Sequence, residues 1–373
     1  MTSRRLVKGI LASLVTLVLA LLLCEGVLWV IGFPTPVRME ETTLFTADDE
    51  LGYRLRPNLV LSGFHTPYFV HPEIRTNSLG FRNTEVAIPK TTGVFRILSL
   101  GDSYAFGWGV KAEECYVRRL EVLLTERSAI SRIEVINAGV PSYTSWKERL
   151  QLDRLLERLS PDLVICQVAD NDLVSSPAQM KSFDQTVPRW VKQVLRNSRV
   201  FALTKALYLE GGSGVRSVFA GETERNRRLS PEQFWEFMES TVTEVDSGLV
   251  HDRARLASYV DDYAAMQTHS GRRLICLILP NRYQIYAGGY LSVGYKWLER
   301  ALQEEGVPAL NATEYLRRNR ETELCLEDTH PNSLGHYLIA DTLAKYLIGS
   351  GFLPPAPARI VNADAAPDTS GSN

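Results

Sequence analysis

The chain has 373 residues, of which 45% are hydrophobic and 23% are charged, and its net charge is -2 at pH 7. This composition is ordinary for one large globular domain with additions. It gives no indication of nucleic-acid binding, and the sequence contains no internal repeat, zinc-type cysteine spacing or phosphate-binding glycine loop. We therefore expect no nucleic-acid partner, no metal and no other cofactor.

The first predicted element is a long apolar stretch near the amino terminus. Three basic residues, the last of them Lys8, precede Gly9–Phe33, which is apolar apart from Glu25 and a few small polar residues. At 1.5 Å per residue a helix of this length can cross a bilayer core of about 30 Å. The alternative is a cleaved signal peptide, but the apolar part is longer than a usual signal core and no A-x-A site follows it. We predict that residues 1–33 form a short cytoplasmic stub and an uncleaved membrane anchor.

The charges around this stretch indicate its orientation. Basic residues lie before it, whereas acidic residues, among them Glu40, Glu41 and Asp48, lie after it. By the positive-inside rule the amino terminus is then cytoplasmic. The chain from about residue 34 is therefore predicted to be extracytoplasmic, in a periplasm or at the cell surface, and held by a single-pass helix.

The segment after the anchor, residues 34–92, contains six prolines among short apolar pieces. This pattern predicts an extended amino-terminal arm rather than a second core. The segment Thr76–Arg82 is expected to end the arm in a turn.

From about residue 93 the pattern changes to alternating strands and helices. Short apolar runs predict strands at Arg96–Leu100, Ile133–Asn137, Asp162–Val168, Arg273–Leu279 and Pro308–Asn311. Five strands joined by helical spacers imply a parallel sheet with right-handed crossovers, which is an α/β fold. We assign residues 93–352 to this domain.

A stretch at residues 173–250 is too long for a simple connection and contains helical patterns, one of them with Trp190 and Val194 on one face. We predict an inserted helical cap that packs on the main domain. Basic residues among these patterns, such as Arg199, leave open a surface that lies on the membrane. Residues 353–373 are rich in Pro, Ala, Ser and Asp without periodicity, and we predict a disordered tail.

The first strand of the domain leads to a candidate nucleophile. The run Ile97–Leu100 is uninterrupted, as a strand buried on both faces requires, and Gly101 permits a sharp turn after it. Ser103 would then lie at the carboxyl edge of the sheet, where open α/β sheets bind ligands, and the next helix would direct free N–H groups at an anion formed there. Gly-Asp-Ser alone proves little, because such a turn is ordinary loop chemistry.

A candidate base lies near the end of the domain. The segment 327–330, Glu-Asp-Thr-His, precedes a helix that begins at about Ser333. A serine hydroxyl is a poor nucleophile at neutral pH, so acyl transfer needs a base at the hydroxyl and donors around the oxyanion. We expect His330 Nε2 to take the proton of Ser103 while the Asp328 carboxylate fixes the imidazole tautomer through Nδ1–H. The alternative is a histidine near a helix start with Asp328 as a local turn or capping residue.

Two further strand ends offer candidate oxyanion donors. Gly139 follows the second strand, and a residue without Cβ permits close approach to its backbone N–H. Asn171 follows the third strand, and its side-chain amide can donate. Each segment alone is an ordinary loop. However, four sequence blocks all fall at predicted strand ends, namely those that carry Ser103, Gly139, Asn171 and His330.

In these blocks the chain resembles the SGNH hydrolases, also called the GDSL family of esterases and lipases, from about Arg96 to Leu347. The resemblance implies a flavodoxin-like, three-layer parallel sheet. It also implies site roles for the matching residues. The nucleophile is Ser103, the base is His330 with Asp328 as its orienter, and the oxyanion hole consists of the Ser103 N–H, the Gly139 N–H and the Asn171 side chain.

The sequence departs from the family pattern in three places. Gly-Asp-Ser is followed by Tyr104 rather than leucine, the usual glycine of Gly-x-Asn-Asp is Ala169, and the acid lies two residues before His330. The familiar Asp-x-x-His spacing would select Glu327, which stays the alternative acid. We prefer Asp328 because an Asp-x-His pair also occurs in related membrane-associated polysaccharide O-acetyltransferases.

Three functions are compatible with these residues. The first is a membrane-anchored extracytoplasmic esterase or lipase-like hydrolase that forms an acyl-serine intermediate. Its rival is an O-acyltransferase that passes the acyl group to or from a polysaccharide with the same triad. A non-catalytic binding module with the same fold is the third. The expected partners are an ester-containing small molecule, a lipid or an acylated glycan, together with the membrane that holds the amino-terminal helix.

Overall fold

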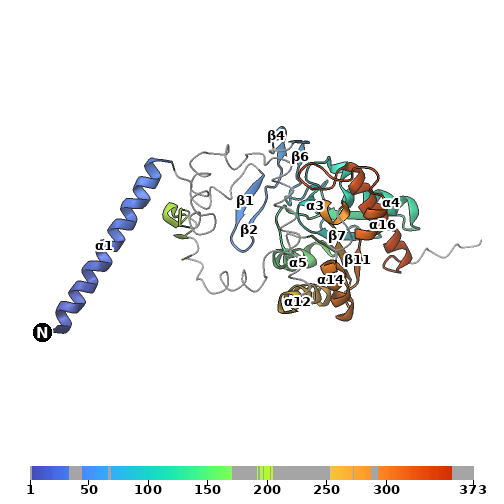
Figure 1. Ribbon diagram of the computed structural model, residues 1–373. Coiled ribbons are helices and arrows are strands. Elements are labelled where there is room, and N and C mark those ends of the chain that lie inside the picture. Colours follow the sequence, from blue (N-terminus) through green and yellow to red (C-terminus); the bar gives the residue numbers. More distant parts are fainter. Residues whose placement is uncertain are drawn as a thin grey trace, which may run out of the picture.

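The computed structural model describes residues 2–32, 44–65, 69–169, 253–271, 273–286 and 293–354, together with parts of 191–204. Its centre is a sheet of five parallel strands in the order β11-β10-β9-β7-β8 (Figure 1). The strands are β7 (Phe95–Leu100), β8 (Ile133–Asn137), β9 (Leu163–Val168), β10 (Leu274–Ile278) and β11 (Ala309–Asn311). Counted along the chain, this is the 2-1-3-4-5 order of flavodoxin-like folds. The predicted fold class is confirmed.

Helices cover both faces of this sheet. On one face lie α4 (Tyr116–Arg127) and α16 (Ser333–Gly349), and on the other lie α5 (Ser145–Leu159), α12 (Arg253–His269) and α14 (Val293–Glu304). Neighbouring strand residues serve opposite layers, because successive side chains point to opposite faces of a strand. In β7, Ile97 packs with the α4 and α16 layer and Leu98 with the other layer.

Burial on both faces explains why the strands lack an alternating pattern. Every residue of β9 and β10 is buried, as parallel strands between two helical layers require. Shorter helices lie at the sheet edges and in the loops: α3 (Ser103–Phe106), the 3-10 turn η1 (Ala112–Glu114), α13 (Arg282–Tyr286) and α15 (Thr313–Arg318).

The described part of the amino-terminal arm contains short antiparallel ladders. The pairs are β1 (Phe45–Asp48) with β2 (Gly52–Leu55), β3 (Val60–Leu61) with β6 (Ile74–Arg75), and β4 (Phe64–His65) with β5 (Val70–His71). Apolar side chains of the arm, including Leu55 and Ile74, form a buried cluster with Phe106, Val140 and Tyr143 of the main domain. The arm therefore packs on the loops that follow β7 and β8.

A buried arginine fixes the end of the arm. The guanidinium of Arg82 donates to the carbonyl oxygens of Phe106 (3.1 Å), Gly107 (2.6 Å) and Val110 (2.8 Å). The same guanidinium lies 5.0 Å from the centre of the Phe106 ring. Since the last carbonyls of a helix lack intrahelical partners, Arg82 satisfies the carboxyl end of α3 and fixes the segment that carries Ser103.

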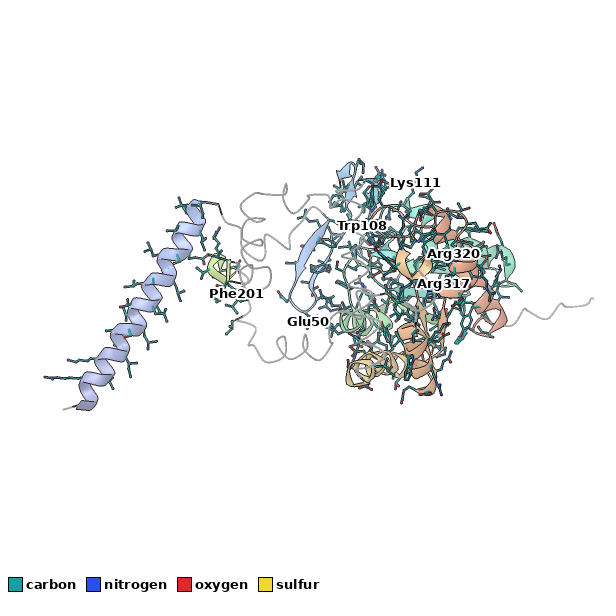
Figure 2. All side chains as sticks on the ribbon, in the orientation of Figure 1. Glu50, Trp108, Lys111, Phe201, Arg317 and Arg320 are labelled. Atoms are coloured by element: carbon teal, nitrogen blue, oxygen red, sulfur yellow. The ribbon has the colours of Figure 1, made fainter. Side chains whose placement is uncertain are left out.

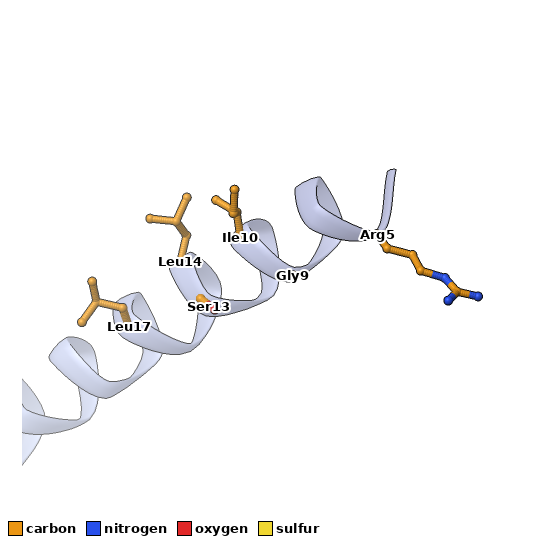
Figure 3. Close-up of a pocket in the computed structure, with 6 residues that line it drawn as sticks. All are labelled: Arg5, Gly9, Ile10, Ser13, Leu14 and Leu17. Carbon is orange, nitrogen blue, oxygen red and sulfur yellow. The ribbon is translucent and has the colours of Figure 1, made fainter. Parts of the chain in front are cut away.

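The amino-terminal helix α1 (Thr2–Val30) lies apart from the sheet in Figure 1. Its segment Val7–Val30 has a mean hydropathy of 2.5 and is long and apolar enough to cross a membrane. A signal sequence near an amino terminus has the same properties. A shallow, open depression on this helix is lined by residues such as Arg5, Ile10 and Leu17 (Figure 3), and it lies apart from the sheet and its loops.

Two predicted segments lie largely or wholly outside the described residues. Most of the insertion at 173–250 does so, and so does the tail from residue 355 onward. All five cysteines are described and free of disulfides, and Cys24 is the exposed one.

Candidate active site

Ser103 lies at the carboxyl end of β7, at the start of α3, as its sequence context predicts. The turn needs a glycine at position 101. Gly101 has φ of +152°, and a Cβ there would lie 2.6 Å from Gln167 Oε1 and 2.7 Å from the Ala105 Cβ. A glycine is therefore required for the backbone to pass over β9 and present the serine.

The first turn of α3 has most of its N–H groups satisfied inside the protein. Asp102 Oδ1 caps the helix by accepting from the Tyr104 N–H at 2.8 Å. Gln167 Oε1, from the neighbouring strand β9, accepts from the N–H groups of Asp102 (3.1 Å) and Ala105 (3.3 Å). Within the described part of the chain nothing accepts from the Ser103 N–H. That donor is thus available to an oxyanion beside the serine hydroxyl.

His330 reaches the serine from the loop before α16. Its Nε2 lies 2.8 Å from Ser103 Oγ, within hydrogen-bond distance. The imidazole packs against two aromatic rings that follow the nucleophile, Tyr104 at 5.4 Å and Trp108 at 6.3 Å between ring centres. The loop is held by a bridge in which the Leu326 N–H donates to the His330 carbonyl at 2.7 Å. The base is therefore positioned by both its backbone and its ring contacts.

Asp328 lies against the other imidazole nitrogen. Its Oδ2 is 3.1 Å from His330 Nδ1, and its Oδ1 accepts from the His330 backbone N–H at 3.4 Å. Between them, Thr329 has φ of +75°, a left-handed conformation that is uncommon outside glycine and that curls the loop back. The Asp328 side chain is only 10% exposed, whereas Glu327 is exposed to solvent. Of the two candidate acids, the structure brings Asp328 to the imidazole.

Gly139 lies close to α3 but its N–H is engaged. It donates to Asn137 Oδ1 at 3.0 Å, so the predicted role as an oxyanion donor would require this N–H to be shared. The need for glycine here is steric, since a Cβ would lie 2.5 Å from the Phe106 nitrogen. The second predicted donor, Asn171, lies outside the described residues. Both oxyanion roles stay predictions.

A second histidine, which the sequence pattern did not single out, belongs to the same neighbourhood. His71 from β5 donates from Nδ1 to the Pro72 carbonyl (2.9 Å), and its Nε2 accepts from the Gly109 N–H (3.0 Å). Burial lowers the pKa of His71 to about 4, so the ring is neutral at pH 7. Its ring centre lies 5.0 Å from that of Trp108, which in turn packs on His330. The arm thereby supports the Trp108 ring that packs on His330.

Gln167 and Arg82 are further residues that the sequence analysis missed. Each acts on the α3 backbone, from β9 and from the end of the arm respectively. The sequence gives one indication of Gln167, because a glutamine is unusual inside an apolar strand. Among the described residues no group of three or more His, Cys, Asp or Glu side chains could hold a metal ion.

A parallel α/β sheet with Ser103, His330 and Asp328 in contact at its carboxyl edge is the arrangement of a serine hydrolase. Independently, the family model described as "GDSL-like Lipase/Acylhydrolase family" matches residues 99–338, which is more than half of the chain. The chain belongs to this family, and it is a serine hydrolase of the GDSL type that acts on ester bonds.

Comparison with solved structures gives low identities throughout. A lipase/acylhydrolase from Enterococcus faecalis is 14% identical, with a TM-score of 0.40, over 70% of this chain and 99% of that one. The acetyl xylan esterase AlAXEase is 12% identical, with a TM-score of 0.39, over 68% of this chain and 100% of that one. The enzyme LAE5 from the metagenome of Lake Arreo is 15% identical, with a TM-score of 0.39, over 69% and 96% of the two chains. No curated protein sequence matches the chain.

Proposed function

We propose that the protein is a membrane-anchored, extracytoplasmic esterase that hydrolyses its substrate through an acyl-Ser103 intermediate. The observation that carries this proposal is the 2.8 Å distance between Ser103 Oγ and His330 Nε2, with Asp328 3.1 Å from the opposite nitrogen. This is the contact between nucleophile, base and orienting acid that activates a serine hydroxyl at neutral pH.

In the first half of the reaction Ser103 Oγ attacks the carbonyl carbon of the ester as His330 Nε2 takes the hydroxyl proton. The carbonyl electrons move to oxygen, and the resulting oxyanion accepts from the Ser103 N–H and from the further donors predicted at Gly139 and Asn171. Collapse of the intermediate breaks the bond to the alcohol oxygen, which takes the proton from the imidazolium. The alcohol leaves and the acyl group stays on Ser103.

In the second half a water molecule replaces the alcohol. His330 takes a proton from the water as its oxygen attacks the acyl carbon, and collapse returns that proton to Ser103 Oγ. The products are the free acid and the regenerated enzyme. Asp328 remains ionised throughout and stabilises the imidazolium in both halves.

The membrane location rests on the amino-terminal helix and the charges beside it. The segment Val7–Val30 is apolar enough to span a bilayer, basic residues precede it, and acidic residues from Glu40 onward follow it. The positive-inside rule then supports a cytoplasmic amino terminus and an extracytoplasmic hydrolase domain. Ester-containing small molecules, lipids and acylated glycans are the substrates that such a domain could meet.

The test is an assay of the full chain in detergent against p-nitrophenyl acetate and a long-chain p-nitrophenyl ester, each with and without an acetylated or free glycan acceptor. We expect release of p-nitrophenol and of free acid in the absence of acceptor. Acyl groups recovered on the glycan in place of free acid would assign the protein to O-acyl transfer. Absence of turnover with every ester, in protein whose fold is intact, would contradict catalysis.

A further inference from the structure

The anchor helix carries one acidic residue within its apolar segment, Glu25. It lies five residues before Val30, which is about 7.5 Å along the helix axis at 1.5 Å per residue. In a helix that spans the membrane from a cytoplasmic amino terminus, this position falls near the outer surface of the bilayer. A carboxylate at that depth is unfavourable unless it has partners, so its contacts identify what packs there.

The partners of Glu25 come from the insertion, more than 170 residues away in the sequence. Its two carboxylate oxygens accept from the N–H groups of Arg199 (2.7 Å) and Val200 (3.0 Å), and from the Ser198 hydroxyl (3.0 Å). The Arg199 guanidinium lies 3.6 Å from the same carboxylate. Every one of these donors belongs to one short stretch of chain.

That stretch is the start of a helical segment. Ser198 Oγ accepts from the Phe201 N–H at 3.1 Å, as an N-cap side chain does, while its own proton goes to Glu25. The carboxylate thus satisfies N–H groups that a helix start leaves without intrahelical partners. Figure 2 shows Phe201 beside the end of α1 that is remote from the amino terminus.

Burial along α1 indicates that one side of its outer end is covered. Leu28, which follows Glu25 by three residues and therefore shares its face, is 6% exposed. Trp29 follows Glu25 by four residues and flanks it on the other side of the same face, and it is 67% exposed, so the covered strip lies on the Leu28 side of Glu25. Elsewhere along α1 the side chains that the structure describes are exposed, so the covered strip is confined to the turn where Glu25 meets the insertion.

We propose that the outer end of α1 is a docking site for residues 198–201, and that Glu25 holds this part of the insertion at the membrane surface. The anchor is then a retained structural component of the enzyme rather than a tether or a removable leader. This inference rests on the proposed membrane placement of α1. It differs from the sequence prediction of a cap packed on the main domain, because the described contacts of this segment are with the anchor.

Native Cys24 provides a direct test, because it is exposed next to Glu25 while the other four cysteines are buried. An Asn197→Cys substitution puts a second exposed thiol next to Ser198. A short bis-maleimide applied to membranes that contain the full chain should join the two. A protease site engineered between residues 33 and 43, cut afterwards, shows whether an amino-terminal tag stays attached to the hydrolase domain.

We expect efficient cross-linking with Glu25 present and a loss of about tenfold or more in Glu25→Leu, since hydrogen bonds to a charged group are each worth a tenfold change or more in an equilibrium. Glu25→Gln, which keeps one acceptor oxygen, should give an intermediate yield. Ser13→Leu, on an exposed part of the same helix, is the matched control and should leave the yield unchanged.

The possible failures are distinguishable. If the mature domain lacks the tag before any protease is added, α1 is removed in the cell, and the membrane placement fails together with the docking site. If the tag is retained but Glu25→Leu cross-links as well as the unsubstituted chain, the anchor stands and the docking role of Glu25 is overturned. Ester hydrolysis by the detergent-solubilised chain is measured in parallel, and it reports on the active site independently of either result.

Discussion

The two-residue offset between Asp328 and His330 works because the residue between them is left-handed. With Thr329 at φ of +75°, a short carboxylate folds back to the imidazole and to the backbone N–H of the same histidine. Glu327, one residue earlier, is exposed to solvent. The proposed role of Asp328 as the orienting acid therefore depends on the left-handed conformation of Thr329.

We predict that Asp328→Asn lowers kcat by about 10⁴ with the fold preserved, because an amide in this place stabilises the wrong imidazole tautomer. Glu327→Gln is the matched control and should stay within about twofold of the unsubstituted enzyme, as expected for an exposed residue without a role. Steady-state kinetics with a p-nitrophenyl ester measure both. If Glu327→Gln lost its activity while Asp328→Asn kept a kcat close to that of the unsubstituted enzyme, the assignment of the acid would be reversed.

Gln167 is a positioning residue for the nucleophile turn. Its Oε1 accepts from two backbone N–H groups on either side of Ser103, and the side chain is fully buried. In Gln167→Leu both N–H groups lose their acceptor, so the turn should relax and kcat should fall by about 10², the effect of a small misplacement of a reacting group.

The control is a second buried glutamine at the opposite end of the sheet. Gln267 Oε1 accepts from the Leu274 N–H at the start of β10. Each of the two substitutions, Gln167→Leu and Gln267→Leu, should lower the free energy of unfolding by about 1–3 kcal/mol. In Gln267→Leu, however, kcat should stay unchanged. Urea unfolding and kinetics on both variants separate stability from positioning, and equal losses of kcat would refute the role of Gln167.

At the scale of elements, two buried histidines join segments of the fold. His336 on α16 accepts from the Tyr116 N–H of α4 at 3.2 Å, and His71 links β5 to Gly109. Burial lowers the pKa of His336 to about 3 and that of His71 to about 4, from an ordinary value of 6.5. Both rings are thus neutral in the folded protein at pH 7.

This pKa difference predicts a pH dependence of stability. Between pH 6.5 and about 4 the unfolded chain binds protons on both histidines and the folded chain does not, so stability is full above pH 6.5 and falls as pH is lowered. Each group contributes at most about 1.4 kcal/mol per pH unit. The urea midpoint should fall across this window, and fall less in His336→Gln. A midpoint that is flat from pH 6.5 to 4 would contradict neutral burial.

The strands were predictable because burial on both faces leaves a simple signal. Short apolar runs located all five strands of the sheet to within one or two residues, including the one that ends before Ser103. The ladders of the arm were not predictable, since pairs such as β3 with β6 have two residues a strand and no periodicity. Their pairing depends on contacts with Phe106 and Tyr143, which sequence spacing does not encode.

The chain order of motifs predicted that Ser103 and His330 meet, because the carboxyl ends of parallel strands lie at one edge, and the two side chains are 2.8 Å apart. Asp328 was preferred to Glu327 from a family resemblance, and the catalytic roles of all three residues stay predictions. The engagement of the Gly139 N–H by Asn137 was not foreseeable, since it depends on a side-chain rotamer. The contact of Glu25 with Arg199 likewise joins segments that share no local pattern.

For the whole molecule, we predict that the hydrolase domain and the amino terminus lie on opposite sides of the membrane that α1 spans. Protease added outside intact cells should digest the hydrolase domain, whereas a tag at the amino terminus should stay protected. In an organism with two membranes the outer one is permeabilised first. A digested tag with a protected domain would show the opposite orientation.

The proposed hydrolysis depends above all on Ser103 as the nucleophile. The most direct measurement is reaction of the full chain with a fluorophosphonate, followed by mass spectrometry of the modified peptide, in the unsubstituted protein and in Ser103→Ala. This role of Ser103 predicts a single adduct on Ser103, and neither labelling nor ester turnover in a folded Ser103→Ala, because the hydroxyl is needed only for the covalent step. An adduct on another residue, or labelling that persists in Ser103→Ala, would contradict it.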